Sequence, residues 1–209
     1  MEEKHLKYEE QYEEKYKAHW DKVYEDLSNE LTDNFREEFL DMHPYDQSLF
    51  FIEQSKENRM RIYAYLSPDE LAEIMINIEL DNTPAYFKEM NPRLGAMVLS
   101  EMPADDAVDI FNEMDKEEVV SFLTIMDKEA AEEIKHLLHY EEKTAGSIMT
   151  TEFVAVYKSQ TTEQAMQQLK EDAPDAETIY YLYVLDEDKR LVGVLSLRDL
   201  IVADEKTKL

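Results

Sequence analysis

Acidic residues at helical spacing are the first feature of the chain that could carry chemistry. Asp105 and Asp109 follow Pro103 four residues apart, so on a helix both carboxylates project from one face. Glu73 occupies a comparable position on an earlier predicted helix. Oxygen ligands of this kind suit a hard divalent cation such as Mg²⁺ or Ca²⁺. From the residues alone, a solvated acidic face is nevertheless the preferred interpretation, ahead of a metal site.

A second candidate lies near the end of the chain, where a predicted strand runs into a predicted helix. Ser196 can act as the N-cap of that helix, and Arg198 and Asp199 follow it. Helix amides together with Arg198 would suit a phosphate, and Asp199 would suit the hydroxyls of a ribose. The same Ser-x-x-Asp spacing is also a capping arrangement that needs no ligand. Both interpretations remain open at this stage.

The composition restricts the partners of the chain. Its 209 residues include 49 Asp and Glu against 22 Lys and Arg, a formal charge of −27, and 44% are hydrophobic, which is enough to form cores. Residues 66–139 alone hold 18 acidic and five basic residues. We expect no nucleic-acid partner, because the affinity of nucleic acids for proteins depends on Lys and Arg neutralising phosphates.

Several function classes lack their required residues. The absence of cysteine excludes disulfides, thiolate metal sites and cysteine nucleophiles. Gly95, Gly146 and Gly193 stand too far apart for a phosphate-binding glycine loop, and no catalytic triad or other enzyme motif is recognisable. The longest apolar run, Ile179–Leu185, is too short to span a bilayer, and residues 1–17 lack an apolar signal core. We therefore expect a non-enzymatic protein in a cytoplasmic setting.

Most of the chain carries a helical pattern. Large side chains recur every three or four residues from Tyr8 to Phe39, which predicts one or two amphipathic helices. An internal repeat of 12 residues then appears. Its grid positions are Met42, Leu66, Ile78, Met90, Met102, Met114, Met126 and Leu138. Each unit is long enough for one short helix and a turn, so we expect stacked helices forming a superhelical domain with the methionines in its core.

The pattern changes near residue 140. We predict strands at Phe153–Tyr157, Ile179–Leu185 and Leu191–Leu195, with a helix at Thr161–Lys170 and a last helix over residues 196–203. The fold class is therefore a mainly α repeat domain over residues 1–139, followed by an α/β module of order β-α-β-β-α over residues 140–209.

Three segments of the second module carry a family resemblance. They are TAGSIMT at residues 144–150, APDAETIYY at residues 173–181 and GVLSLRDLIVAD at residues 193–204. The last contains the Gly-x-x-Ser-x-x-Asp pattern of a CBS module, and the three together resemble the MgtE family of magnesium channels and transporters. The acidic helical repeats are similar to the N-terminal superhelical domain of that family.

The resemblance implies a cytosolic Mg²⁺ sensor that gates a homodimeric magnesium pathway of the inner membrane. In the family, ions between the N domain and paired CBS modules hold a compact, closed form. Glu73, Asp105 and Asp109 match the acidic positions that face those ions. Tyr181, Arg198 and Asp199 match positions of an adenine-nucleotide site where ATP tunes the Mg²⁺ sensitivity, and Ser196 belongs to the same motif.

The resemblance also implies partners outside this sequence. We expect residues 140–209 to be the first of two CBS modules, and the chain to be a fragment lacking the second module and the transmembrane pore. One rival hypothesis makes the chain chiefly an adenine-nucleotide-binding regulatory module, with the acidic helices as a passive spacer. Another makes it an acidic scaffold for a basic protein surface, whose association would be sensitive to salt.

Overall fold

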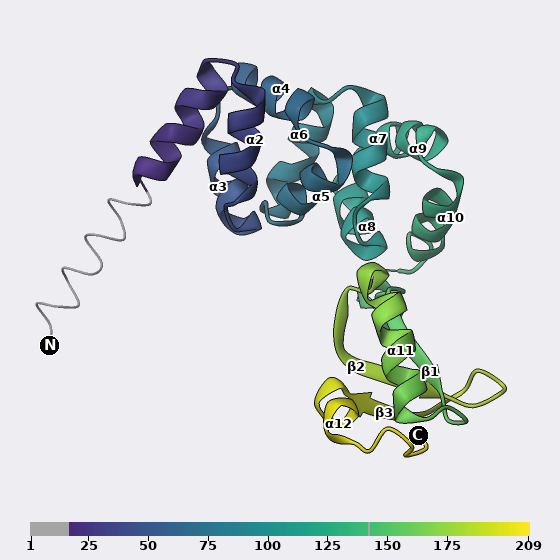
Figure 1. Cartoon of the computed structure of the whole chain (residues 1–209). Helices are drawn as coiled ribbons and strands as arrows, with labels where there is room; N and C mark the ends of the chain where they lie inside the picture. The colour runs from purple at the N-terminus through teal and green to yellow at the C-terminus, as the bar shows by residue number, and fades with distance from the viewer. Residues whose placement is uncertain (1–16, 142) are drawn as a thin grey trace, which may run out of the picture. The chain divides into compact units, whose positions relative to one another are not determined.

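The computed structural model describes residues 17–141 and 143–209, and these divide into two units (Figure 1). One unit comprises residues 1–102 and 106–135, as far as they are described, and the other comprises residues 103–105 and 136–209. The predicted stripe at Tyr8, Tyr12 and Tyr16 falls outside the described residues.

The first unit consists of short helices joined by tight turns. A helix over residues 17–28 comes first. It is followed by α2 (Thr32–Leu40), α3 (Pro44–Glu53), α4 (Lys56–Tyr65), α5 (Pro68–Ile76), the 3₁₀ turn η1 (Leu80–Asn82), α6 (Thr83–Glu89), α7 (Pro92–Ser100), α8 (Ala104–Asn112), α9 (Lys116–Ile125) and α10 (Lys128–Leu137). The first two residues of α8 and the last two of α10 belong to the second unit. The predicted stripe from Tyr8 to Phe39 thus includes two helices, with buried Val23 and Leu27 on the first and buried Phe35 and Phe39 on the second.

Local signals start several of these helices. Ser67 and Glu70 form a capping box at the start of α5, and Asp115 and Glu118 form another at the start of α9. The side chain of Asn91 caps α7, where Pro92 occupies the first turn. The expectation of one short helix per 12-residue unit is therefore confirmed from α5 onward.

The methionines of the repeat contribute to the core of this unit, as predicted. Most residues on the 12-residue grid lie at helix ends with at most 9% of their surface exposed: Met42, Leu66, Met90, Met102, Met114 and Met126. Ile78 and Leu138 differ, because both are only half-buried. Ile78 lies in the loop between α5 and η1, where it lines a small pocket, and Leu138 follows the last repeat helix.

From α3 to α9, every second helix packs against the next but one along the chain. Helix α5 packs against both α3 and α7, and α7 also packs against α9 (Figure 1). A helix of nine or ten residues is marginal in water, so burial against such neighbours is what stabilises each one. The fully buried side chains are mostly aromatic and aliphatic, among them Phe35, Phe39, Phe50, Phe51, Phe87 and Phe111.

The second unit contains a three-stranded sheet and two helices. Its elements are the 3₁₀ turn η2 (Ala145–Ile148), β1 (Phe153–Tyr157), α11 (Thr162–Asp172), the 3₁₀ turn η3 (Ala173–Asp175), β2 (Thr178–Leu185), β3 (Leu191–Ser196) and α12 (Leu197–Val202). Strand β2 is central, parallel to β1 and antiparallel to β3. The predicted β-α-β-β-α order is confirmed.

The core of the second unit lies between the sheet and its helices. It consists of Val154, Val156, Ala165, Leu169, Leu182, Val184 and Leu200. Because side chains alternate across a strand, Tyr181 and Tyr183 lie on the opposite face of β2 from Leu182 and Val184. Tyr181 pairs with Ser196 across the antiparallel ladder, which brings the middle of β2 beside the start of α12.

The last residues of the chain return across the start of α11. The backbone N–H groups of Thr162 and Glu163 donate to the carbonyls of Thr207 (2.9 Å) and Glu205 (3.1 Å). The N–H of Leu209 donates to the carbonyl of Gln160 (3.2 Å), and Leu209 packs against the core of the unit. The returning segment thus satisfies amides at a helix end that the helix itself leaves unpaired.

Candidate functional site

The first candidate site is the acidic surface of α5 and α8. The side chain of Glu73 is exposed on α5, between inward-facing residues that are buried. On α8, Asp105 is half-buried and Asp109, one turn later, is exposed. The predicted helical placement of all three carboxylates is therefore correct.

A small pocket adjoins this surface. It has a volume of about 110 Å³ and is lined by the end of α5, η1 and α8. Asp109 lines it together with Asp106, which the sequence reasoning did not select. The sequence signal for Asp106 was its place directly after Asp105 in an acidic run. That signal does not distinguish it from other carboxylates; only the packing of α8 beside η1 and the end of α5 does. Glu73 is not among the residues that line the pocket.

The three predicted ligands do not form a closed metal site by themselves. Within residues 17–141 and 143–209, no group of three or more His, Asp or Glu side chains is arranged to hold a metal ion. The chemistry of the donors still fits Mg²⁺, which binds carboxylate oxygens and commonly retains several of its waters. The assignment of Glu73, Asp105 and Asp109 as ligands stays a prediction.

Carboxylates on α5, α6 and α9 are instead paired with basic side chains. Glu70 forms a salt bridge with Arg36, Glu89 with Arg59 and Glu118 with Lys88. Burial pushes the pKa of Glu70 upward, but hydrogen bonds from Arg36 and Ser67 outweigh it and leave the pKa below its ordinary value. These carboxylates join helices to one another, whereas Glu73 and Asp109 present theirs to solvent.

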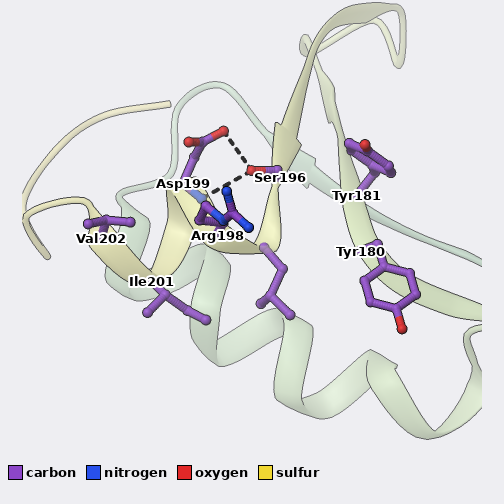
Figure 2. Close-up of a pocket in the computed structure, with 8 residues that line it drawn as sticks. Tyr180, Tyr181, Ser196, Arg198, Asp199, Ile201 and Val202 are labelled. Carbon is purple, nitrogen blue, oxygen red and sulfur yellow. Dashed lines mark hydrogen bonds between the residues drawn. The ribbon is translucent and has the colours of Figure 1, made fainter.

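The second candidate site is a pocket at the junction of β2, β3 and α12, shown in Figure 2. Its volume of about 950 Å³ is in the range of small-molecule sites. The pocket is open to solvent, as the exposed fractions of 73% for Tyr180 and 74% for Val202 show. Its lining consists of Tyr180, Tyr181, Ser196, Leu197, Arg198, Asp199, Ile201 and Val202.

All four predicted nucleotide-site residues line this pocket. Figure 2 shows the tyrosine side chains on β2, and those of Ser196, Arg198 and Asp199 at the start of α12. Sequence reasoning did not select Tyr180, Ile201 or Val202, which add apolar surface to the same pocket. The sequence signal that could have identified Tyr180 is its position next to Tyr181.

The capping interpretation of Ser-x-x-Asp is confirmed. The hydroxyl of Ser196 accepts a hydrogen bond from the backbone N–H of Asp199 (3.1 Å) and donates one to the Asp199 carboxylate (2.6 Å), as the dashed lines in Figure 2 show. Capping and ligand binding are compatible uses of these residues. Nucleotide binding by Tyr181, Ser196, Arg198 and Asp199 stays a prediction.

None of the helices formed by the described residues is long and apolar enough to cross a membrane. The chain matches two family models in succession. The MgtE intracellular N domain matches residues 42–143, and the CBS domain matches residues 145–206.

Curated relatives of the chain are longer proteins. A magnesium transporter MgtE from Enterococcus faecalis is 50% identical over 187 residues, which cover 88% of this chain and 41% of the relative. A magnesium transporter MgtE from Thermus thermophilus is 37% identical over 176 residues, covering 83% of this chain and 39% of the relative. The chain thus spans about two fifths of the length of these relatives.

Two solved structures have the same fold. The cytosolic domain of the Mg²⁺ channel MgtE in complex with ATP matches with a TM-score of 0.80 and 36% identity, covering 90% of this chain and 77% of that one. The soluble part of a magnesium transporter matches with a TM-score of 0.88 and 46% identity, covering 92% of this chain and 76% of that one. A sequence that joins these two domains in this order and shares this fold and identity belongs to the MgtE family.

Proposed function

We propose that the chain is the Mg²⁺-sensing regulatory region of a magnesium transporter, acting on the cytosolic side of the membrane. Membership of the MgtE family supports this role, since the curated relatives are magnesium transporters rather than enzymes. The observation that carries the proposal is the exposure of Glu73 on α5 and Asp109 on α8, in a helical unit where Glu70, Glu89 and Glu118 instead join helices through Arg and Lys.

In this proposal, Mg²⁺ bound at Glu73, Asp105 and Asp109 draws the acidic domain toward the CBS modules. The remaining ligands come from the facing surface, because three carboxylates without a closed cluster leave room for further oxygen donors. When Mg²⁺ is withdrawn, like charges repel and the two surfaces separate. The separation releases a transmembrane pore. In this proposal the working protein consists of that pore, a second CBS module and a second copy of the chain.

We place the boundary between the two domains of this chain near residue 140.

The energetics require several ions. A ligand shifts a conformational equilibrium only by as much as its affinity differs between the two states. Moving a switch from 1:99 to 99:1 takes about 5.5 kcal/mol, more than one weakly held, hydrated Mg²⁺ supplies. Cooperative binding of Mg²⁺ is therefore an integral part of the proposal.

The test is Mg²⁺-dependent protection of the full-length gene product from a protease, at constant ionic strength. Asp105→Asn with Asp109→Asn should raise the Mg²⁺ concentration at half-protection by about tenfold or more, the usual effect of disturbing a metal site. The matched control is Asp21→Asn with Glu25→Gln, because these residues are likewise acidic and four residues apart on one helix, and their replacement changes the charge equally. Equal midpoints for the two double variants would contradict the proposal.

A second candidate function is nucleotide binding at the pocket between β2 and α12. It is favoured by the convergence of Tyr181, Ser196, Arg198 and Asp199 on that pocket, and by the similarity to a domain solved with ATP. The Arg198 guanidinium would bind phosphate, Asp199 would accept hydrogen bonds from ribose hydroxyls, and a tyrosine ring would pack on the base.

Calorimetry separates the two functions. If the chain is chiefly a nucleotide module, ATP releases heat in the full-length protein and Mg²⁺ causes no protease protection. Arg198→Ala should then abolish the heat of ATP binding, whereas Arg190→Ala, in the β2–β3 turn away from the pocket lining, should leave it unchanged. Persistence of the ATP heat in Arg198→Ala would remove this residue from the nucleotide site.

A further inference from the structure

A single guanidinium connects three helices at the start of α5. Nη1 of Arg36, on α2, donates to the backbone carbonyl of Tyr65 at the end of α4 (2.6 Å) and to Oε2 of Glu70 on α5 (2.8 Å). Nη2 donates to Oε1 of the same carboxylate (2.7 Å). Such a two-pronged pair fixes orientation as well as distance, because both partners are planar.

The Glu70 carboxylate also hydrogen-bonds to the backbone at the start of its own helix. Its Oε2 accepts the N–H of Ser67 (2.8 Å), which is half of the capping box that begins α5. The carboxylate therefore links Arg36 directly to the first turn of the helix. Only 19% of the Glu70 side chain is exposed, so solvent competes weakly for these bonds.

Glu73 lies three residues after Glu70, one turn further along α5. Residues three apart are neighbours on a helix surface, so any rotation or tilt of the first turn redirects Glu73 as well. The helix has only nine residues, and its inward side is apolar: Leu71, Ala72, Ile74 and Met75 are buried. Apolar packing is non-directional, so polar contacts set the orientation of α5: the two-pronged Arg36–Glu70 pair at its start, and at its end a longer hydrogen bond from the Ser48 hydroxyl to the Asn77 carbonyl (3.3 Å).

A second pair of the same chemistry provides a comparison within the unit. Arg59, on α4, donates through Nε and Nη2 to the two carboxylate oxygens of Glu89 at the end of α6 (2.9 and 2.7 Å). Its Nη1 donates to the backbone carbonyl of Gln54 at the end of α3. Helices α4 and α6 carry none of the predicted Mg²⁺ ligands, so this pair stabilises the stack without orienting one.

We propose that Arg36 is a positioning residue of the magnesium site, which holds α5 through Glu70 so that the Glu73 carboxylate faces the ion. This inference rests on the function proposed above, since it assigns Arg36 a role through Glu73. Arg36 does not touch the ion. Its contribution is to reduce the freedom of a ligand that would otherwise have to be ordered when Mg²⁺ binds.

The experiment is a double-mutant cycle in the full-length protein, with the Mg²⁺ concentration at half-protection from protease as the readout. Arg36→Gln should raise this midpoint by about fivefold, within the range seen when networks that couple to a site are altered. In a Glu73→Gln background, the same substitution should change the midpoint by less than about twofold, because the ligand it positions is gone. Arg36→Lys, which keeps the positive charge and a hydrogen-bond donor, should give a midpoint between those of the wild type and Arg36→Gln.

Arg59→Gln is the matched control, because it removes an equal charge and an equivalent pair. An added negative charge by itself strengthens cation binding, so this control should leave the midpoint unchanged or slightly lower. Equal shifts for Arg36→Gln with and without Glu73, or equal shifts for Arg36→Gln and Arg59→Gln, would show that Arg36 serves the fold only and would overturn the inference. If Glu73→Gln leaves the midpoint unchanged, the ligand assignment of the proposed function fails, and the role of Arg36 fails with it.

Discussion

At the scale of single residues, the structure separates carboxylates that hold helices together from carboxylates available to a ligand. Hydrogen bonds from Arg59 hold the pKa of Glu89 below its ordinary value of 4.5, and hydrogen bonds to Glu89 raise the pKa of Arg59. The hydroxyl of Tyr63 lies beside Glu89, and burial of that hydroxyl raises its pKa. The acidity of the chain is thus partly neutralised within the helical stack, whereas Glu73 and Asp109 present their carboxylates to solvent.

These pKa shifts predict how stability depends on acid. Glu70 and Glu89 have folded-state pKa values below their ordinary 4.5, so each contributes stability above pH 4.5 that is lost as the pH falls through its folded value. The free energy of unfolding, from urea titrations at successive pH values, should decline below about pH 4.5. Glu89→Gln should lower the slope of the unfolding free energy against pH by at most about 1.4 kcal/mol per pH unit, which corresponds to the uptake of about one proton.

The control for this pH dependence is Glu132→Gln. Glu132 also faces a lysine, Lys128, but 67% of its side chain is exposed, so its salt bridge is expected to contribute little. Glu132→Gln should keep the slope of the wild type. A Glu89→Gln variant with the wild-type slope would contradict the assignment of acid sensitivity to the Arg59–Glu89 pair.

At the scale of elements, α7 illustrates why a helix carries a glycine in its interior. A Cβ at Gly95 would lie 2.9 Å from Cε1 of Phe122 on α9, closer than normal packing allows. The Phe122 ring packs edge-on against Phe87 and is tilted against Phe111, with ring centroids 6.2 and 6.3 Å away. The ring is therefore confined, and close approach of α7 and α9 depends on the missing side chain.

Gly95→Ala should consequently destabilise the helical unit. Alanine favours the helix by about 1 kcal/mol, but overpacking a confined ring costs about 1–3 kcal/mol, so we expect a net loss of about 1 kcal/mol. Urea unfolding followed by circular dichroism measures this change. Met97→Ala on the same helix, where 54% of the side chain is exposed, should stay within about 0.5 kcal/mol of the wild type. A stabilised Gly95→Ala variant would contradict the packing argument.

The sequence predicts the elements better than their packing, for physical reasons. Strand β1 has its predicted bounds, and β3 extends one residue beyond its prediction, because alternation along a strand is a local signal. The 12-residue grid likewise indicates where helices end. The pocket containing Asp106 and Asp109, by contrast, depends on contacts of α8 with η1 and the end of α5, which no local pattern encodes. The roles of Arg36 and Gly95 depend on partners 34 and 27 residues away and were missed for the same reason.

At the scale of the whole molecule, the two units have separate hydrophobic cores. The core of the second unit is a closed set of side chains from β1, α11, β2 and α12. The first unit has a core of its own, in which aliphatic side chains and methionines outnumber the aromatic ones. Separate cores allow separate folding, since each unit buries its own apolar surface.

We therefore expect residues 1–139 and residues 140–209 to fold when each is produced alone. The amide NMR spectrum of each piece should superimpose on the corresponding part of the spectrum of the whole chain, apart from signals near the cut and around Ala104 and Glu152, whose hydrogen bond (3.0 Å) the cut removes. Moving the cut to residue 160 provides the comparison, because it separates β1 from the sheet and should leave the shorter piece unfolded. An unfolded piece from the cut at 139 would show that the predicted boundary is wrong.

The segment over residues 203–209 has a mechanical consequence. Backbone carbonyls of this segment accept hydrogen bonds from the first N–H groups of α11, and Leu209 packs against the core. A pulling force applied at Leu209 would therefore load the hydrogen bonds at the start of that helix first. These bonds are few and lie at a helix end, where they yield more readily than a strand ladder. Displacing the last residue would thus fray α11 from its first turn while the sheet stays intact.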